Sequence, residues 1–286
     1  MKSPFVVLRI TILLTVICCP IIWGAENPAT NVNSAELDSF MKKWARYESF
    51  KVPIDPTDEP LLLAALRKDP GGPWASYLAA KFAETIFEAR GLGITERAAK
   101  YRAALGYLKP ARKILLLAVK TEPANDKLAH LSNTIEQAVA KASLEAGVDL
   151  DEAKASAKAM LAGNTDVKSW NYGNIIYEAN SILGRIALRE DKLDEAKKHL
   201  LAAGQTPGSP QLNSFGPDFI LAREFLEKNE KTTVLEFLDL VERFWANTEK
   251  STEANAKRVA ADNLKKLQAW REQIRAGKTP DDPKWK

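Results

Sequence analysis

Beyond about residue 30, apolar residues recur along the chain at steps of three and four positions, with polar residues between them. This spacing places apolar side chains on one face of a helix and is typical of amphipathic α-helices. Long alternating runs of β-branched residues, which would indicate strands, are absent from the sequence. The pattern therefore predicts an all-α fold. Helices are expected at Ser34–Glu48, Leu61–Lys68, Pro73–Arg90, Thr95–Leu108, Pro110–Lys120, Asn125–Ala146, Asp149–Ala162, Ser169–Arg189, Leu193–Ala203, Pro217–Lys228, Lys231–Trp245 and Thr252–Arg275.

Gly and Pro fall between these periodic segments and set their boundaries. We expect Pro110 to separate two helices, because proline lacks the backbone donor that a helix interior needs. We expect Gly204 to stop a helix in the left-handed conformation and Pro217 to open the next helix at its first turn. The final segment, Gly277–Lys286, is polar and is predicted to be a loose tail in which Trp285 is exposed.

A repeated pentapeptide indicates how the helices pair. Leu-Asp-Glu-Ala-Lys occurs at 150–154 and again at 193–197, which is 43 positions later. Each copy lies where a helix hairpin would enter its second helix. Around the later copy, small residues stand at Gly184, Ala196 and Ala203, and they would let two helices approach closely.

The unit Tyr177–Gly208 resembles the tetratricopeptide helix-turn-helix pattern, which has a Leu-Gly pair, an Ala twelve residues later, a large apolar residue and a second Ala. Second-helix positions equivalent to Ala196 recur at Ala111, Ala153 and Val234, at spacings of 42, 43 and 38 residues. The family period is about 34 residues, so these units are longer. The resemblance implies an α-solenoid of helix pairs over 94–276, after an N-terminal helical region at 25–93 and with a long closing C-terminal helix.

The stretch Gly204–Pro217 is also similar to a segment that recurs in uncharacterised exported bacterial helical-repeat proteins. That resemblance implies a place in a bacterial envelope and no particular activity. Residues 1–24 agree with it, because Lys2 and Arg9 precede a 14-residue apolar run from Ile10 to Trp23, as in a secretory signal peptide. A membrane-spanning helix needs about 20 apolar residues, so this shorter run favours a cleaved leader over a retained membrane anchor. We expect no span in the mature chain.

Composition excludes several classes of function. Without the leader, 39 basic and 37 acidic side chains remain, and both signs are interspersed, which gives no basic patch for nucleic acid. The only cysteines, Cys18 and Cys19, lie in the leader, and the only histidines, His130 and His199, are far apart in sequence. We therefore expect no metal site and no cofactor. Nucleophile-elbow and phosphate-loop motifs are absent, so the protein is predicted not to be an enzyme.

The tetratricopeptide resemblance implies a concave groove lined by the first helices of successive units. Its arginines would suit a peptide or protein partner that carries carboxylates, because Arg grips a carboxylate with two parallel hydrogen bonds. Surface ion pairs, such as Glu178 with Arg185, are the alternative. The loop 204–217 either caps its helices or offers polar side chains to a ligand. The candidate binding residues are Glu178, Ser181, Arg185, Arg189, Gln211, Asn213, Phe219 and Arg223.

Two other functions stay open at this point. A glycan-binding or glycan-cleaving envelope protein would use exposed aromatic rings, and Trp170-Asn171-Tyr172 is polar enough to be partly exposed. Cleavage would also need a carboxylic acid with a raised pKa, for which Glu84 and Glu88 are candidates, although their basic neighbours favour a solvated stripe. Self-association is the third possibility, and the oligomeric state cannot be read from the sequence.

Overall fold

The computed structural model describes residues 32–44, 58–89, 91–214, 216–249 and 254–285. Within these ranges every regular element is a helix and no strand is present, so the predicted all-α fold class is confirmed. The predicted leader, residues 1–24, lies outside the described residues. The elements are α1 (Ser34–Trp44), α2 (Glu59–Lys68), α3 (Trp74–Glu88), α4 (Ile94–Thr121), α5 (Asp126–Ala146), α6 (Leu150–Gly163), α7 (Tyr172–Arg189), α8 (Leu193–Gly204), α9 (Pro210–Ser214), α10 (Ile220–Glu227), α11 (Lys231–Glu249), α12 (Ala254–Arg275) and a 3₁₀ turn, η3 (Pro283–Trp285).

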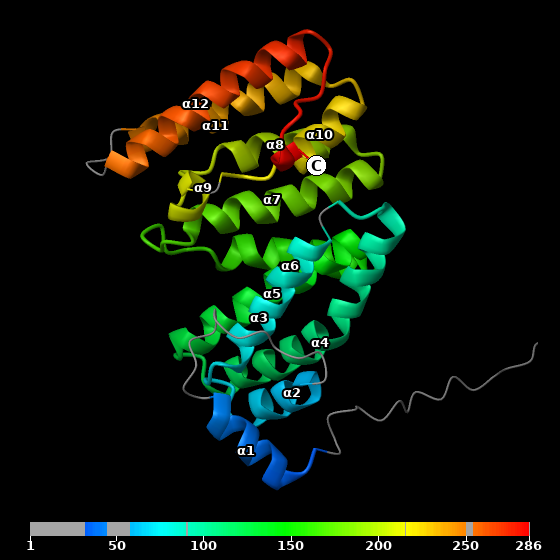
Figure 1. The fold of residues 1–286 in the computed structure, drawn as a ribbon, viewed down its shortest axis with the longest axis vertical. Coiled ribbons are helices and arrows are strands. Elements are labelled where there is room, and N and C mark those ends of the chain that lie inside the picture. Colours follow the sequence, from blue (N-terminus) through cyan, green and yellow to red (C-terminus); the bar gives the residue numbers. More distant parts are fainter. Residues whose placement is uncertain (1–31, 45–57, 90, 215, 250–253, 286) are drawn as a thin grey trace, which may run out of the picture.

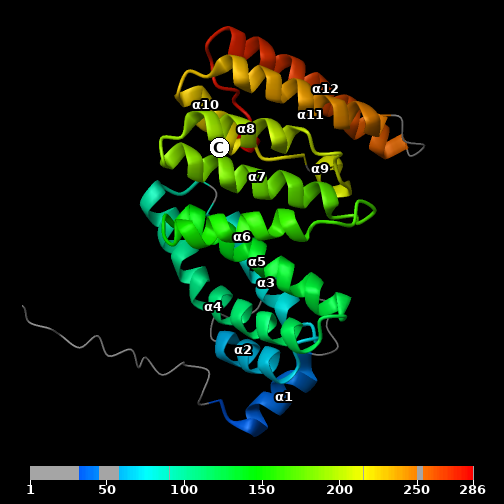
Figure 2. The same cartoon turned by 180° about the vertical axis from the view of Figure 1, so that it is seen from behind.

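The helices are stacked along an elongated body, with α1 at the bottom and α12 at the top in Figure 1. The view from behind shows the same stacking (Figure 2). Neighbours in sequence pack against each other, most extensively α4 with α5, α7 with α8, and α11 with α12. The apolar core accordingly divides into three consecutive clusters, within α1–α5, among α5–α7, and from α7 to the C-terminal segment. None of the helices in the described ranges is both long and apolar enough to span a membrane.

Local chemistry sets several helix ends. At the start of α5, the side-chain Oδ1 of Asn125 accepts a hydrogen bond from the backbone N–H of Leu128, at 3.2 Å. This bond satisfies a backbone donor that has no partner inside the helix. At the other end of α5, Gly147 adopts a left-handed conformation, with φ of 67°. The expected boundaries of this helix are therefore correct to within a residue.

The expected break at Pro110 is wrong, because α4 runs through it without interruption. Proline removes one intrahelical hydrogen bond and crowds the preceding turn. Apolar residues on both sides of Pro110, including Leu108 and Leu115, are nevertheless buried in the same core cluster. Packing of both halves of α4 against the same part of the core holds the helix together despite the local cost.

The expected left-handed stop at Gly204 is also wrong, since Gly204 is the last residue of α8 and has no positive φ. A Cβ atom at this position would lie 2.9 Å from the Cβ of Leu240 and 2.9 Å from a ring carbon of Phe237. Glycine is needed there for the close approach of α11. Within the loop that follows, Gly208 and Gly216 have a positive φ, of 86° and 73°.

The C-terminal segment is packed rather than loose, and the expectation that Trp285 is exposed is wrong. Trp285 is only 1% exposed. Its ring stacks on Phe219 at a centroid distance of 5.0 Å and an interplanar angle of 12°, and it meets Trp270 edge-on. The backbone N–H of Phe219 donates to the carbonyl oxygen of Lys284 at 2.7 Å. Burial of a large aromatic ring explains why this polar segment returns to the body of the protein.

Candidate functional site

The predicted binding arginines are committed to contacts within the protein. Arg185, on α7, is 9% exposed and lies between two carboxylates from neighbouring helices. It donates to Glu145 of α5 and, through Nε at 2.8 Å, to Glu224 of α10. Desolvation opposes the charged guanidinium, but the two carboxylates outweigh it and raise the pKa of Arg185. This ion triad leaves Arg185 no free face for a ligand carboxylate.

The other residues of the predicted groove are also engaged in the fold. Arg189 donates to the carbonyl oxygen of Leu144 at 2.5 Å, and Arg223 donates to that of Trp285 at 3.2 Å. Phe219 is fully buried, and Ser181 is buried on α7. The structure therefore does not bring these side chains together as an open groove. The alternative, ion pairing, describes Arg185 better, although its partners are Glu145 and Glu224.

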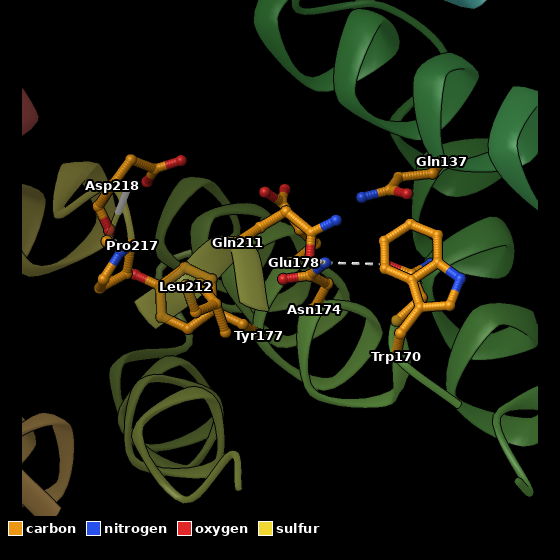
Figure 3. A pocket seen from close by; sticks show the side chains of 11 residues that line it. Gln137, Trp170, Asn174, Tyr177, Glu178, Gln211, Leu212, Pro217 and Asp218 are labelled. Carbon is orange, nitrogen blue, oxygen red and sulfur yellow. Dashed lines mark hydrogen bonds between the residues drawn. The ribbon is translucent and has the colours of Figure 1, made fainter. Parts of the chain in front are cut away.

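An open cavity of about 290 Å³ lies instead beside α5 and the first turns of α7. We call it the Trp170 pocket. Figure 3 shows Trp170 and Gln137 at one end, and Pro217 and Asp218 at the other. Its walls come from α5, the loop before α7, α7 itself, α9 and the loop before α10. The polar side chains that line it are Gln137, Asn171, Asn174, Glu178, Gln211 and Asp218.

Hydrogen bonds hold the amide side chains of this pocket in place. Nδ2 of Asn174 donates to Oδ1 of Asn171 at 2.8 Å and to Oε1 of Gln211 at 3.0 Å. The hydroxyl of Ser209 donates to Oδ1 of Asn174 at 2.5 Å and accepts from the backbone N–H of Leu212 at 3.0 Å. Asn174 therefore connects α7 to α9: its Nδ2 group orients the amides of Asn171 and Gln211, and its Oδ1 atom is held by Ser209.

The loop that carries Gln211 is also clamped onto the start of α7. The hydroxyl of Thr206 donates to the carbonyl oxygen of Gly173 at 2.8 Å. The approach is so close that a Cβ atom on Gly173 would lie 1.9 Å from the carbonyl oxygen of Gly208. The loop 204–217 thus packs against α7 and places Gln211 in the pocket wall, while its role in binding a ligand stays a prediction. Asn213, in contrast, does not line the pocket.

Trp170 is the exposed element of the pocket. It is 54% exposed, whereas most other tryptophans of the described residues are buried. Its indole packs at a tilt against the ring of His130, on α5, with the ring centroids 6.2 Å apart. One side of the indole is thus supported by α5 while a large apolar surface remains in contact with solvent. Exposed aromatic surface beside polar groups is typical of binding sites.

Two carboxylates line the pocket and share one cation. Nζ of Lys141, on α5, lies 3.6 Å from Glu178 and 3.8 Å from Asp218. Burial raises the pKa of the Glu178 carboxyl, although the ammonium of Lys141 acts against this effect. In the same cluster, the hydroxyl of Tyr177 donates to the backbone carbonyl of Asp218. Because Lys141 pairs with both carboxylates, neither of them is an isolated charge.

The carboxylates considered for acid catalysis do not have the required environment. Glu84 and Glu88 are both exposed on α3. Glu88 accepts a hydrogen bond from Lys100 at 2.8 Å, and this bond lowers the pKa of the carboxyl. A general acid needs a raised pKa, so Glu88 is unsuited to that role. Among the described residues, no group of three or more His, Cys, Asp or Glu side chains is placed to hold a metal ion.

Comparisons with protein-family models, with curated proteins and with solved structures found no match to this chain. The tetratricopeptide resemblance therefore stays a prediction. Of the eight candidate binding residues, Glu178 and Gln211 line the Trp170 pocket. Reasoning from the sequence missed Gln137, Asn174 and Asp218. The polar run at Trp170-Asn171-Tyr172 was the signal in the sequence that could have indicated the pocket, because the exposed Trp170 and the amide of Asn171 both line it.

Proposed function

We propose that the protein is a non-enzymatic binding module of the bacterial envelope, built as a tetratricopeptide-like α-solenoid, that holds its ligand in the Trp170 pocket. The observation that carries this proposal is a polar cavity with a half-exposed tryptophan at one end and amides held by hydrogen bonds behind it. A preformed site of this kind binds without first ordering its own side chains. The predicted leader, which lies outside the described residues, supports the envelope location.

Helix packing supports the solenoid. The pairs α5–α6, α7–α8 and α10–α11 each pack internally, α5 and α10 both contact α7, and α8 contacts α11. The equivalent second-helix positions Ala153, Ala196 and Val234 are all fully buried. A methyl group on Gly184 would lie 2.6 Å from Leu221 of α10 and 3.3 Å from His199 of α8. A small residue at the meeting point of three helices is what stacked helix pairs require.

The ion pairs of the pocket carboxylates are in keeping with a binding surface. Glu178 and Asp218 both lie within 4 Å of the same ammonium group, Lys141. Their arrangement is suited to shaping and charging a binding surface. The partner of this module is expected to offer a small polar group to the pocket, because a volume of about 290 Å³ is near the lower limit for ligand pockets.

Capture from an envelope extract by the immobilised protein tests this proposal. The Trp170→Ala variant removes the exposed ring, and Val167→Ala serves as the matched control. Val167 is 69% exposed on the same loop and does not line the pocket. We expect one or more components to be retained by the wild type and by the control and to be lost from Trp170→Ala. Equal capture by all three proteins, or capture of nothing by any of them, would reject the pocket as the binding site.

A further inference from the structure

The exposed tryptophan determines what shape of ligand the pocket can accept. With 54% of Trp170 exposed and one side of its indole packed on His130, a broad apolar ring surface is presented beside polar groups. The face of an aromatic ring is electron-rich and attracts weakly positive hydrogens. One face of a pyranose ring is a flat array of C–H bonds of this kind, while its hydroxyl groups point outward around the edge. A flat ligand with an apolar face and a polar edge therefore matches Trp170.

The amides beside the ring determine which polar groups the ligand carries. Oδ1 of Asn171 and Oε1 of Gln211 accept from Asn174, so the Nδ2 and Nε2 groups of these two residues remain available as donors. Within the described part of the chain, the amide of Gln137 forms no hydrogen bond to protein and can both donate and accept. Hydroxyl groups are the natural complement, because each one donates and accepts as well.

The charges that line the pocket favour a neutral ligand over an anionic or a cationic one. Two carboxylates, Glu178 and Asp218, line the pocket, and no Lys or Arg side chain lines it. This surface repels an anionic ligand. A cationic ligand would have to compete with Lys141, which already lies 3.6 and 3.8 Å from the two carboxylates. A neutral ligand avoids both costs, and its hydroxyl groups can donate to the outer oxygen atoms of the carboxylates.

We propose that the Trp170 pocket binds one neutral pyranose unit of an oligosaccharide, with its apolar face on Trp170 and its hydroxyl groups on Gln137, Asn171 and Gln211. This inference rests on the proposed function and specifies the ligand of the same site. The volume of about 290 Å³ suits a single ring, and the open end lets the rest of the glycan extend into solvent.

Calorimetric titration with defined probes tests the inference. The sugar probes are the neutral tetrasaccharides of β-1,4-glucose, α-1,4-glucose, β-1,4-mannose and β-1,4-N-acetylglucosamine, together with an acidic tetragalacturonate. A lysine-containing tetrapeptide and a glutamate-containing tetrapeptide are the other probes. The proteins are the wild type, Trp170→Ala, Gln137→Leu and Val167→Ala. Gln137→Leu keeps the bulk of the side chain and removes its capacity to hydrogen-bond a ligand, so it provides a second variant if Trp170→Ala folds poorly.

We expect at least one neutral tetrasaccharide to bind the wild type and Val167→Ala alike. Trp170→Ala should weaken that binding by about tenfold, which corresponds to about 1.4 kcal/mol, because it removes the aromatic surface on which the sugar ring stacks. Gln137→Leu should weaken it to a similar or smaller extent. The acidic tetragalacturonate and the glutamate-containing peptide should bind at least about tenfold more weakly than the neutral sugar, because two carboxylates and no cationic side chain line the pocket. The lysine-containing peptide should also bind at least about tenfold more weakly, because its ammonium group has to compete with Lys141 for the same carboxylates.

Other outcomes overturn the inference in distinguishable ways. If a peptide binds in a Trp170-dependent manner and no neutral sugar does, the pocket is a binding site but its ligand class is not a glycan. If a sugar binds equally to the wild type and to both pocket variants, it binds elsewhere on the protein. If no probe binds and extract capture is also insensitive to Trp170, the proposed function fails together with the inference.

Discussion

The ion triad of Arg185 offers the most direct test of the structure. The change is Arg185→Met, which keeps an unbranched apolar stem of similar length and removes the guanidinium. In the wild type, the side chains of Arg185 and Glu145 are 10% and 7% exposed, and that of Glu224 is 21% exposed. The substitution leaves two carboxylates without their cation, and the more buried of them, Glu145, cannot regain full hydration.

Breaking a buried pair by removing one partner typically costs about 3–5 kcal/mol of the free energy of unfolding. For a protein of this size, each kcal/mol lowers the melting temperature by about 2–4 °C, so we expect a decrease on the order of 10 °C. Urea unfolding followed by circular dichroism measures the free energy, and a thermal scan measures the temperature. Two-state behaviour has to be checked with a second spectroscopic probe.

Arg271→Met is the matched control. Arg271 also bridges two carboxylates, at 2.7 Å from Asp239 and 2.5 Å from Glu242, and its own side chain is 11% exposed. The carboxylates differ from those of the Arg185 triad, because they are 64% and 44% exposed and can be solvated once the arginine is gone. Exposed ion pairs are worth about 0–1 kcal/mol. The control should therefore be much less destabilising than Arg185→Met.

The pH dependence follows from the pKa of Glu145. Desolvation acts to raise it, but Arg185 outweighs this effect and lowers the pKa of Glu145 in the folded protein. A lowered folded-state pKa contributes stability above the unfolded value, which is about 4.3, and this stability is lost as the pH falls. The pKa of Glu224 is raised by burial, so Glu224 does not add to this trend. The deficit of Arg185→Met should thus be largest near pH 7 and shrink below about pH 4.

Two results would refute this reasoning. A deficit below about 1 kcal/mol at pH 7, or one equal to that of Arg271→Met, would mean that the triad is solvated like a surface pair. An Arg185→Met variant that is stable but has lost the Trp170-dependent binding would mean that the guanidinium contacts the ligand. That result would support the prediction that Arg185 lines a binding groove.

Three further changes should have measurable effects on stability. Gly173→Ala places a Cβ atom 1.9 Å from the carbonyl oxygen of Gly208, and no side-chain rotation relieves this overlap. We therefore expect the free energy of unfolding, measured with urea, to fall by about 1–3 kcal/mol, and ligand binding to weaken. Trp285→Ala removes a fully buried ring and should cost about 3–5 kcal/mol, whereas a loose tail would make it silent in the same assay. Burial lowers the pKa of His199 in the folded protein, so protonation of this side chain favours the unfolded chain. The wild type should therefore lose stability relative to His199→Gln as the pH falls from 7 to 5, through the ordinary histidine pKa of about 6.5. Parallel curves of the free energy of unfolding against pH for the two proteins would contradict this.

Much of the secondary structure could be predicted from the sequence, because helix formation depends on residues three and four positions apart. The periodic spacing placed most helices, and the small residues at Gly184, Ala196 and Ala203 marked where α7 and α8 approach each other. All three are buried in the structure. Local signals did fail where packing over a longer range outweighed them. Pro110 was expected to end a helix, yet the shared core on both sides of it keeps α4 continuous.

Only the tertiary structure decided what each functional side chain contacts. Arg185 pairs with residues 40 positions before it and 39 positions after it, and no pattern along the chain specifies such partners. The same holds for the pocket, where Gln137 and Gln211 come from helices far apart in sequence and line one cavity together with Trp170. The physical reason is that helix–helix angles and separations, which are set by interlocking side chains of several helices at once, determine which polar groups meet. The amino-acid sequence by itself determined the helices and their close contacts, and the packing of those helices decided that the arginines stabilise the fold while the amides face an open cavity.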